Sequence, residues 1–194
     1  MRVNKFQRIC LLWAIFNLLI LATACGDWIS QAVNVINLLV PAINAALAIL
    51  MAFGVGVSPD VRAAVQKWSA EAVDTLTNVV RPLLDQYKAA VDDPAKATIL
   101  AKIQAAVQVT IDNLASILPS IHVANPQTEA KIKAVFQLVL AQIIALVNLV
   151  PALTPNSKLS LHQKMKLARQ VKSDKEFRHE FNDLADDFGD EYRI

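Results

Sequence analysis

Apolar residues recur at steps of three and four through the middle of this 194-residue chain. This is the spacing of a helix with one face to bury. In residues 59–91 the apolar stripe consists of Val61, Val65, Trp68, Ala72, Leu76, Val79, Leu83 and Tyr87. In residues 94–118 it consists of Ile99, Ile103, Val107, Ile111, Leu114 and Leu118. Both segments are therefore predicted to be amphipathic helices.

Helix starts are marked by three dipeptides, Ser58-Pro59, Asp93-Pro94 and Asn125-Pro126. In each, a side chain that can cap a helix precedes a proline suited to the first helical turn. With Asp27 as a further cap, the chain is expected to form helices over 27–53, 59–91, 94–118 and 126–150. Short links favour an all-α, antiparallel four-helix bundle.

Two prolines and a pair of glycines are expected to bend or end helices of this bundle. Pro41 and Pro82 fall inside expected helices, so both helices are predicted to kink, because proline removes one backbone hydrogen bond. Gly54 and Gly56 fall between the first two helices and predict a helix end followed by a turn.

The first and fourth expected helices differ from the middle two because residues 28–58 and 134–156 carry no charge. Either run is long enough to cross a bilayer. However, Ser30, Asn34, Asn37 and Asn44 share one side of the first helix, and Gln137, Gln142 and Asn148 interrupt the fourth. Two interpretations stay open: the most buried helices of a bundle, or membrane-spanning helices that face a partner or a pore.

The amino terminus has the order of a secretory signal. Residues 1–8 carry Arg2, Lys5 and Arg8, residues 9–22 are apolar apart from one asparagine, and small residues lead to Cys25. The apolar run is shorter than the ~20 residues of a membrane span. An uncleaved membrane anchor is the alternative.

The segment Leu21-Ala22-Thr23-Ala24-Cys25 resembles the signal of bacterial lipoproteins, in which a small residue precedes an invariant cysteine. It departs from the family by having Ala22, rather than leucine, three residues before the cysteine. The resemblance implies cleavage at Ala24, diacylation of the Cys25 sulfur and a location on the exported side of the bacterial envelope. It covers only about the first 26 residues.

Charge and cysteine content fit such processing. Three of the 19 basic residues lie in the first 24 residues, which leaves 16 against 17 acidic residues. A nearly neutral chain lacks the excess of positive charge by which proteins bind nucleic acid. Cys10 would be removed with residues 1–24, so the remaining cysteine, Cys25, could form no disulfide within the chain.

The carboxyl-terminal residues 156–194 form a third region after the signal, 1–24, and the bundle, 25–155. Residues 158–172 hold five basic and no acidic residues, and residues 180–191 hold six acidic and no basic ones, which predicts two short helices of opposite charge. Ser173 and Glu176 have capping-box spacing. The stripe that follows consists of Phe177, Phe181, Leu184 and Phe188. This stripe either packs on the bundle or docks a partner protein through the 173–189 helix. The basic residues in 158–172 could instead bind anionic lipid head groups.

Catalytic and metal-binding motifs are sparse. The histidines are His122, His162 and His179, and only Glu176 with His179 has the spacing of a di-iron helix, which requires a second such motif. We expect no catalysis, cofactor or metal. The sequence therefore favours an envelope lipoprotein that acts as a structural or binding module. An integral membrane protein, oligomeric or pore-like, and a binder of lipid or another apolar ligand are the alternatives.

Overall fold

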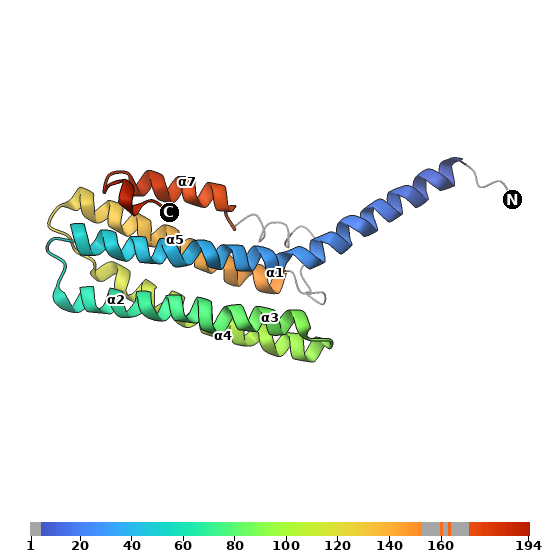
Figure 1. Ribbon diagram of the computed structural model, residues 1–194, viewed down its shortest axis with the longest axis horizontal. Helices are drawn as coiled ribbons and strands as arrows, with labels where there is room; N and C mark the ends of the chain where they lie inside the picture. Colours follow the sequence, from blue (N-terminus) through green and yellow to red (C-terminus); the bar gives the residue numbers. More distant parts are fainter. Residues whose placement is uncertain (1–4, 153–159, 161–162, 164–170) are drawn as a thin grey trace.

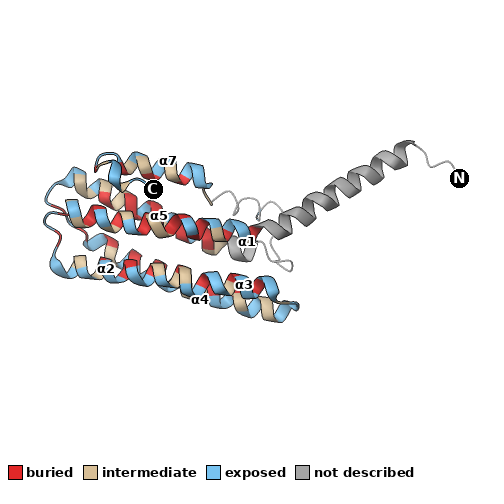
Figure 2. Ribbon diagram, viewed as in Figure 1, coloured by how far each residue is buried: buried red, intermediate tan, exposed pale blue. Residues whose placement is uncertain are grey.

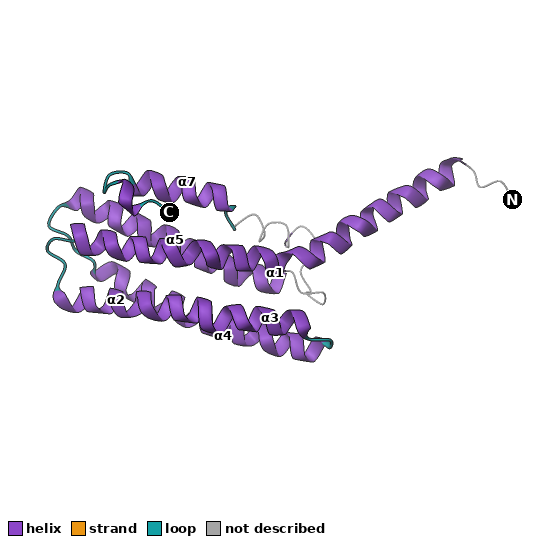
Figure 3. Ribbon diagram, in the orientation of Figure 1, coloured by secondary structure: helices purple, strands orange, loops and turns teal. Residues whose placement is uncertain are grey.

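A computed structural model describes residues 5–152, 160, 163 and 171–194, and describes side chains from Trp28 to Asn148, at 160 and 163, and from 171 onward. The described chain is helical, with short loops at the ends of the helices and no strand (Figure 3). This confirms the predicted all-α class. The expected basic helix in 158–172 lies largely outside the described residues.

Apart from the start of α1, the helices begin and end close to the positions expected from the sequence. The α-helices are α1 (Lys5–Phe53), α2 (Pro59–Asp74), α3 (Arg81–Ala89), α4 (Asp93–Ile117), α5 (Pro126–Ala152) and α7 (Asp174–Ala185). A π-helical segment, η1 (Thr75–Val80), joins α2 to α3, and short 3-10 turns follow at η2 (Leu118–Ser120) and η3 (Asp190–Tyr192).

Four long helical segments lie side by side (Figure 1). Helix α1 packs on α2, α3 and α5, and α4 packs on the same three helices, so α1 and α4 occupy opposite corners. The chain turns back at each link between segments, and α7 packs on α1 and α5 (Figure 1). The part of α1 before Trp28 extends past the ends of the other helices.

Two helix starts differ from the expected ones. Helix α1 runs without a break from Lys5, so the helix start expected at Asp27 is wrong, and Asp27 lies inside the helix. The cap of α4 is Asp92 rather than Asp93: its Oδ1 accepts a hydrogen bond from the backbone N–H of Ala95 at 2.7 Å. Since Pro94 has no N–H, the cap binds the next free donor.

The other two caps are confirmed. The Ser58 hydroxyl accepts a hydrogen bond from the backbone N–H of Val61 at 3.3 Å. The Asn125 side chain accepts from the N–H groups of Gln127 and Thr128 at 2.8 and 3.3 Å. Each satisfies donors that the first turn of a helix leaves without a partner.

Pro41 lies inside α1, whereas Pro82 lies in the first turn of α3, directly after the π segment. In that segment the N–H of Arg81 bonds to the carbonyl of Leu76, five residues back. The wider turn adds one residue to the repeat, so the buried stripe continues through Val80 and Leu84. The prediction that Val79 lies on the buried face is therefore wrong, because Val79 is exposed, whereas Leu83 is half-buried and packs against the core.

The core lies between the four segments, and buried residues line the facing sides of their helices (Figure 2). Of the described residues, Ser69, Thr110 and Gln142 are the buried polar ones. The indole N–H of buried Trp68 donates to the Thr110 carbonyl at 2.9 Å, which links α2 to α4. No buried side-chain polar atom in the described part lacks a hydrogen-bond partner.

The Gly54–Gly56 segment ends α1 and turns the chain into α2, as the sequence predicts. Gly56 has φ 95°, a conformation that favours glycine. A Cβ at Gly56 would lie 3.0 Å from the backbone nitrogen of Ala124. That nitrogen donates to the Val55 carbonyl at 2.7 Å, so the α1–α2 and α4–α5 links are joined at one end of the bundle.

Candidate functional site: the end of the bundle beside Cys25

Ala24 and Cys25, the expected cleavage and acylation residues, lie in α1 three to four residues before Trp28, where only the path of the helix is described. Trp28 is 3% exposed and begins the buried part of α1. A chain attached to a membrane through Cys25 would therefore hold its bundle against that membrane with almost no linker. We refer to this end of the bundle as the anchor end.

Aromatic contacts fix α1 at the anchor end. The Trp28 and Tyr87 rings pack edge to face with centroids 5.0 Å apart, and the Lys96 ammonium lies 5.8 Å from the Tyr87 ring centroid. Edge-to-face pairs add about 0.5–1.5 kcal/mol beyond the area that they bury. The contacts join Trp28 of α1, three residues after Cys25 in the chain, and the start of α4 to the end of α3.

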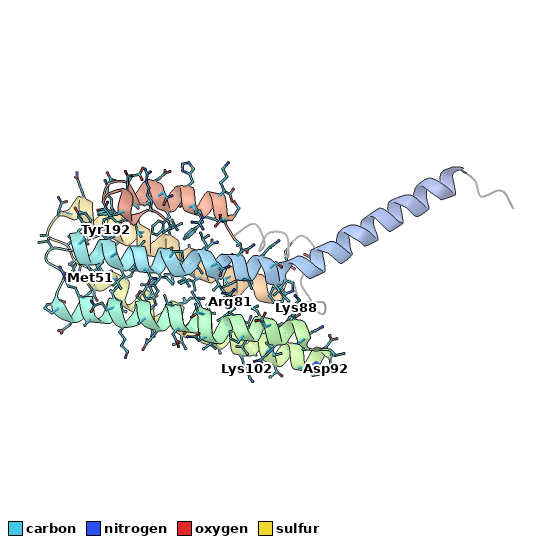
Figure 4. The ribbon with its side chains drawn as sticks, in the orientation of Figure 1. Met51, Arg81, Lys88, Asp92, Lys102 and Tyr192 are labelled. Carbon is cyan, nitrogen blue, oxygen red and sulfur yellow. The ribbon has the colours of Figure 1, made fainter. Side chains whose placement is uncertain are left out.

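Helices α3 and α4 meet at this same end. Figure 4 places Lys88 and Asp92 there, and Met51 and Tyr192 at the opposite end. Val91, in the α3–α4 link, is 95% exposed. Among the residues whose side chains are described, the anchor end thus presents both charge signs and the exposed apolar side chain of Val91.

The carboxyl-terminal segment is attached to the bundle through Gln142 of α5. Buried Gln142 of α5 donates from Nε2 to the Lys172 carbonyl at 3.1 Å and accepts from the Lys172 N–H at 3.2 Å. The Lys172 ammonium pairs with Glu180 on the next helix. Residue 172 is therefore held through its backbone as well as its side chain.

The capping box at the start of α7 is confirmed: the Ser173 hydroxyl accepts from the Glu176 N–H, and the Glu176 carboxylate accepts from the Ser173 N–H at 3.0 Å. The Ser173 hydroxyl also donates to the Glu176 carboxylate at 2.8 Å, and this bond, followed by the bond from the Ser173 N–H, lowers the pKa of Glu176. The apolar stripe of α7 packs on the bundle, with Phe177 and Phe181 fully buried. A partner protein can reach only the charged outer face of the expected 173–189 helix in this arrangement.

A groove of about 500 Å³ separates the start of α7 from α1. It is lined by Gln31, Asn34, Val35, Leu38, Val171, Lys172, Ser173, Asp174 and Glu176. Its size is that of a small-molecule site, but such sites are mostly apolar with few polar groups. Here six of the nine lining residues are polar or charged, although apolar atoms form the larger part of the wall, and Glu176 and Lys172 are already bound to partners of their own.

The histidines are not brought together. His179 lies 3.1 Å from Asp183, and Glu176 is engaged by Ser173, so each residue of the Glu-x-x-His spacing has another partner. His122 lies 3.7 Å from Glu129 in the α4–α5 link, and His162 lies outside the described residues. Within the described ranges no three histidine, cysteine or acidic side chains are close enough to hold a metal ion.

Comparison with known proteins gives no relative: no family model, no curated protein and no solved structure matches this chain. The site must therefore be argued from its own residues. Sequence reasoning noted Gln142 only as an interruption of an apolar helix and did not identify its partner. Gln142 falls on the buried face of its helix, and because buried amides are hydrogen-bonded, this position could have indicated that it has a partner within the chain.

Proposed function

We propose that this protein is a cell-envelope lipoprotein, cleaved at Ala24 and acylated at Cys25, whose helical bundle stands in water at a membrane surface. It acts as a structural or binding module and carries out no catalysis. Two acyl chains anchor a protein stably, since each buried methylene contributes about 0.8 kcal/mol. The bundle itself then has no need to enter the bilayer.

The polarity of α1 is the observation that supports this proposal. Two described stretches, Trp28–Phe53 and Pro126–Asn148, are long and apolar enough to cross a membrane. In α1, however, the aliphatic residues Ile36, Leu39 and Ile43 point into the core, while Asn34 and Asn44 are exposed. Lipid would surround the amides and leave them without partners, whereas water satisfies them.

Helix α5 shows the same polarity. Gln137 is exposed, and the buried amide of Gln142 is fully engaged by Lys172. Gln137 can therefore bond to water, and Gln142 has its partner within the chain. Of the described large hydrophobic residues, only Val55, Val79, Val91, Val109 and Ile144 are exposed, and they are scattered over different elements.

The unbroken course of α1 from Lys5 to Phe53 favours a second candidate. An uncleaved chain would use residues 9–24 as a membrane anchor that continues directly into the bundle. The function would still be that of a membrane-held module, but as an integral membrane protein without acyl groups. The binder of apolar ligands has weaker support, because the groove beside α7 is lined mainly by polar and charged residues.

The intact mass of the protein purified from membranes tests both candidates. We expect a chain that begins at Cys25 and carries added acyl mass. The full 194-residue mass would contradict the lipoprotein proposal and favour the uncleaved anchor. Cys25→Ala should block acylation and cleavage, with Cys10→Ala as the matched control that leaves the mature mass unchanged. A chain that lacks residues 1–25 should be soluble without detergent; if it needs detergent, the proposed water-exposed bundle is wrong.

A further inference from the structure

The outward face of α1 carries a line of uncharged residues that no other helix of the described chain covers fully. We name this line the amide stripe; it consists of Ser30, Asn34, Asn37, Pro41, Asn44 and Ala48. All except half-buried Pro41 are exposed. Successive members are four, three, four, three and four residues apart, so the stripe runs straight along the helix for about 27 Å at 1.5 Å per residue.

The stripe differs from the other outward faces in having no charge. From Trp28 to the end of α1 there is no charged residue, whereas exposed charges occur on the outer faces of the neighbouring helices. Examples are Lys67 and Glu71 on α2 and Asp174 on α7. Depletion of charge is typical of the part of a surface that becomes buried in an interface.

We infer that the amide stripe pairs with the amide stripe of a second copy of this chain. A carboxamide is both donor and acceptor, so an asparagine can bond to the same residue of another copy. In a two-fold interface, the same surface patch must complement itself. Charged side chains would meet like charges there, whereas amides meet without repulsion.

The spacing of the stripe suits this pairing. Alternating steps of three and four keep the stripe on one face of α1. In a two-helix seam, which is otherwise apolar, an asparagine fixes the register at some expense of stability. An anchor at Cys25 holds all copies on one membrane in the same orientation, so equal residues face each other; this step rests on the proposed function. A lipid surface would leave the amides without partners, and a charged partner would bury charge against them.

Arg81 borders the stripe, and its Nη1 donates to the Asn37 Oδ1 at 3.4 Å. Because Asn37 is already engaged within the chain, Asn34 and Asn44 are the positions that test the inference most directly. Asn113 is the matched control: it is an exposed asparagine on α4, at the corner of the bundle opposite α1.

The experiment uses the full-length protein in its membranes, with a single cysteine introduced as Asn34→Cys, Asn44→Cys or Asn113→Cys. After treatment with a short bifunctional maleimide, denaturing gels should show cross-linked dimer several-fold more abundant at 34 and 44 than at 113. Equal yields at the three positions would indicate random collision and overturn the inference. Absence of dimer at 34 and 44 would overturn it as well.

Cross-linking of the parent chain, which has no introduced cysteine, tests the proposed anchor separately from the pairing of the stripes. Acylated Cys25 cannot react, so a cross-link in the parent would show a free thiol and contradict the anchor alone. The three variants are then compared again in a Cys10→Ala, Cys25→Ala background. As an independent measurement, Asn34→Asp with Asn44→Asp should abolish dimer by placing like charges opposite each other, whereas Asn113→Asp should leave it unchanged. Dimer that persists with both aspartates would contradict pairing through the stripe.

Discussion

The side chain of Gln142 and the backbone of Lys172, thirty residues apart in the chain, form a reciprocal pair of hydrogen bonds, 3.1 and 3.2 Å long. Gln142 is 2% exposed, so water has little access to either bond. One carboxamide thus replaces the partners that the N–H and C=O of residue 172 would otherwise need. The pair fixes where the carboxyl-terminal segment meets α5.

Gln142→Ala should therefore loosen this segment. The substitution removes both bonds and leaves a part-buried backbone donor and acceptor without their partner, which costs about 1–3 kcal/mol. The free energy of unfolding should fall by that order in urea, and amide exchange at residue 172 should accelerate. Gln137→Ala is the matched control, because Gln137 is an exposed glutamine on the same helix. Equal effects of the two substitutions would show that the pair contributes nothing.

Arg62 is expected to stabilise the carboxyl-terminal end of α1. Its guanidinium donates to the carbonyl oxygens of Gly54 at 2.6 Å, Val57 at 3.3 Å and Met51 at 3.5 Å. The last carbonyl groups of a helix have no partner within the helix, so the side chain stabilises the end of α1 and the turn after it. Arg62→Met keeps the apolar stem and should lower the free energy of unfolding by about 1–3 kcal/mol.

The control for Arg62 is Lys67→Met on the same helix. Lys67 forms one exposed ion pair with Glu71 at 3.8 Å, and such pairs contribute about 0–1 kcal/mol. Arg62→Lys should restore little, because an ammonium cannot reach three oxygens in the same fork geometry. Full stability of Arg62→Lys would show that charge alone, rather than the directed bonds, holds the turn.

The all-α class and the helix starts at Ser58 and Asn125 could be predicted from the sequence because the rules that govern them are local. The register of the core beyond Leu76 could not, since it depends on the π turn that shifts burial from Val79 to Val80. The partner of Gln142 is thirty residues away, and no spacing rule joins them. Local patterns thus predicted the helices, whereas the contacts that fasten the carboxyl-terminal segment depend on tertiary packing.

Acid should weaken the link between α4 and α5 through Glu129. Its carboxylate accepts from the Lys133 ammonium at 2.6 Å and from the Val123 N–H at 2.9 Å, and these bonds lower its pKa from the usual 4.5. His122 also faces the group, at 3.7 Å. Because the folded pKa is depressed, the stabilisation is present above pH 4.5 and is lost as the pH falls through the folded pKa.

The test compares unfolding of the natural chain with that of Glu129→Gln as the pH falls. A glutamine resembles a protonated glutamate, so the difference in free energy of unfolding should be largest above pH 4.5 and should shrink toward zero in acid. Ser173 also lowers the pKa of Glu176, and Arg193 lowers that of Asp186. Because both carboxylates are present in the two proteins, their contributions cancel in the difference. A difference that does not change with pH would contradict the assignment to Glu129.

The final prediction is that α7 can open without the rest of the bundle. It contacts only α1, α5 and η3 extensively, and its buried face relies on Phe177 and Phe181, whose rings stack with centroids 6.1 Å apart. Phe181→Ala should remove about 3–5 kcal/mol of packing. Since opening of α7 alone leaves the contacts between α1, α2, α4 and α5 intact, amide exchange should accelerate in residues 174–185 and stay unchanged in α4. Leu184→Ala, at a half-buried position, should have a smaller effect. Equal acceleration in α4 and α7 would show instead that the carboxyl-terminal helix folds as one cooperative unit with the bundle.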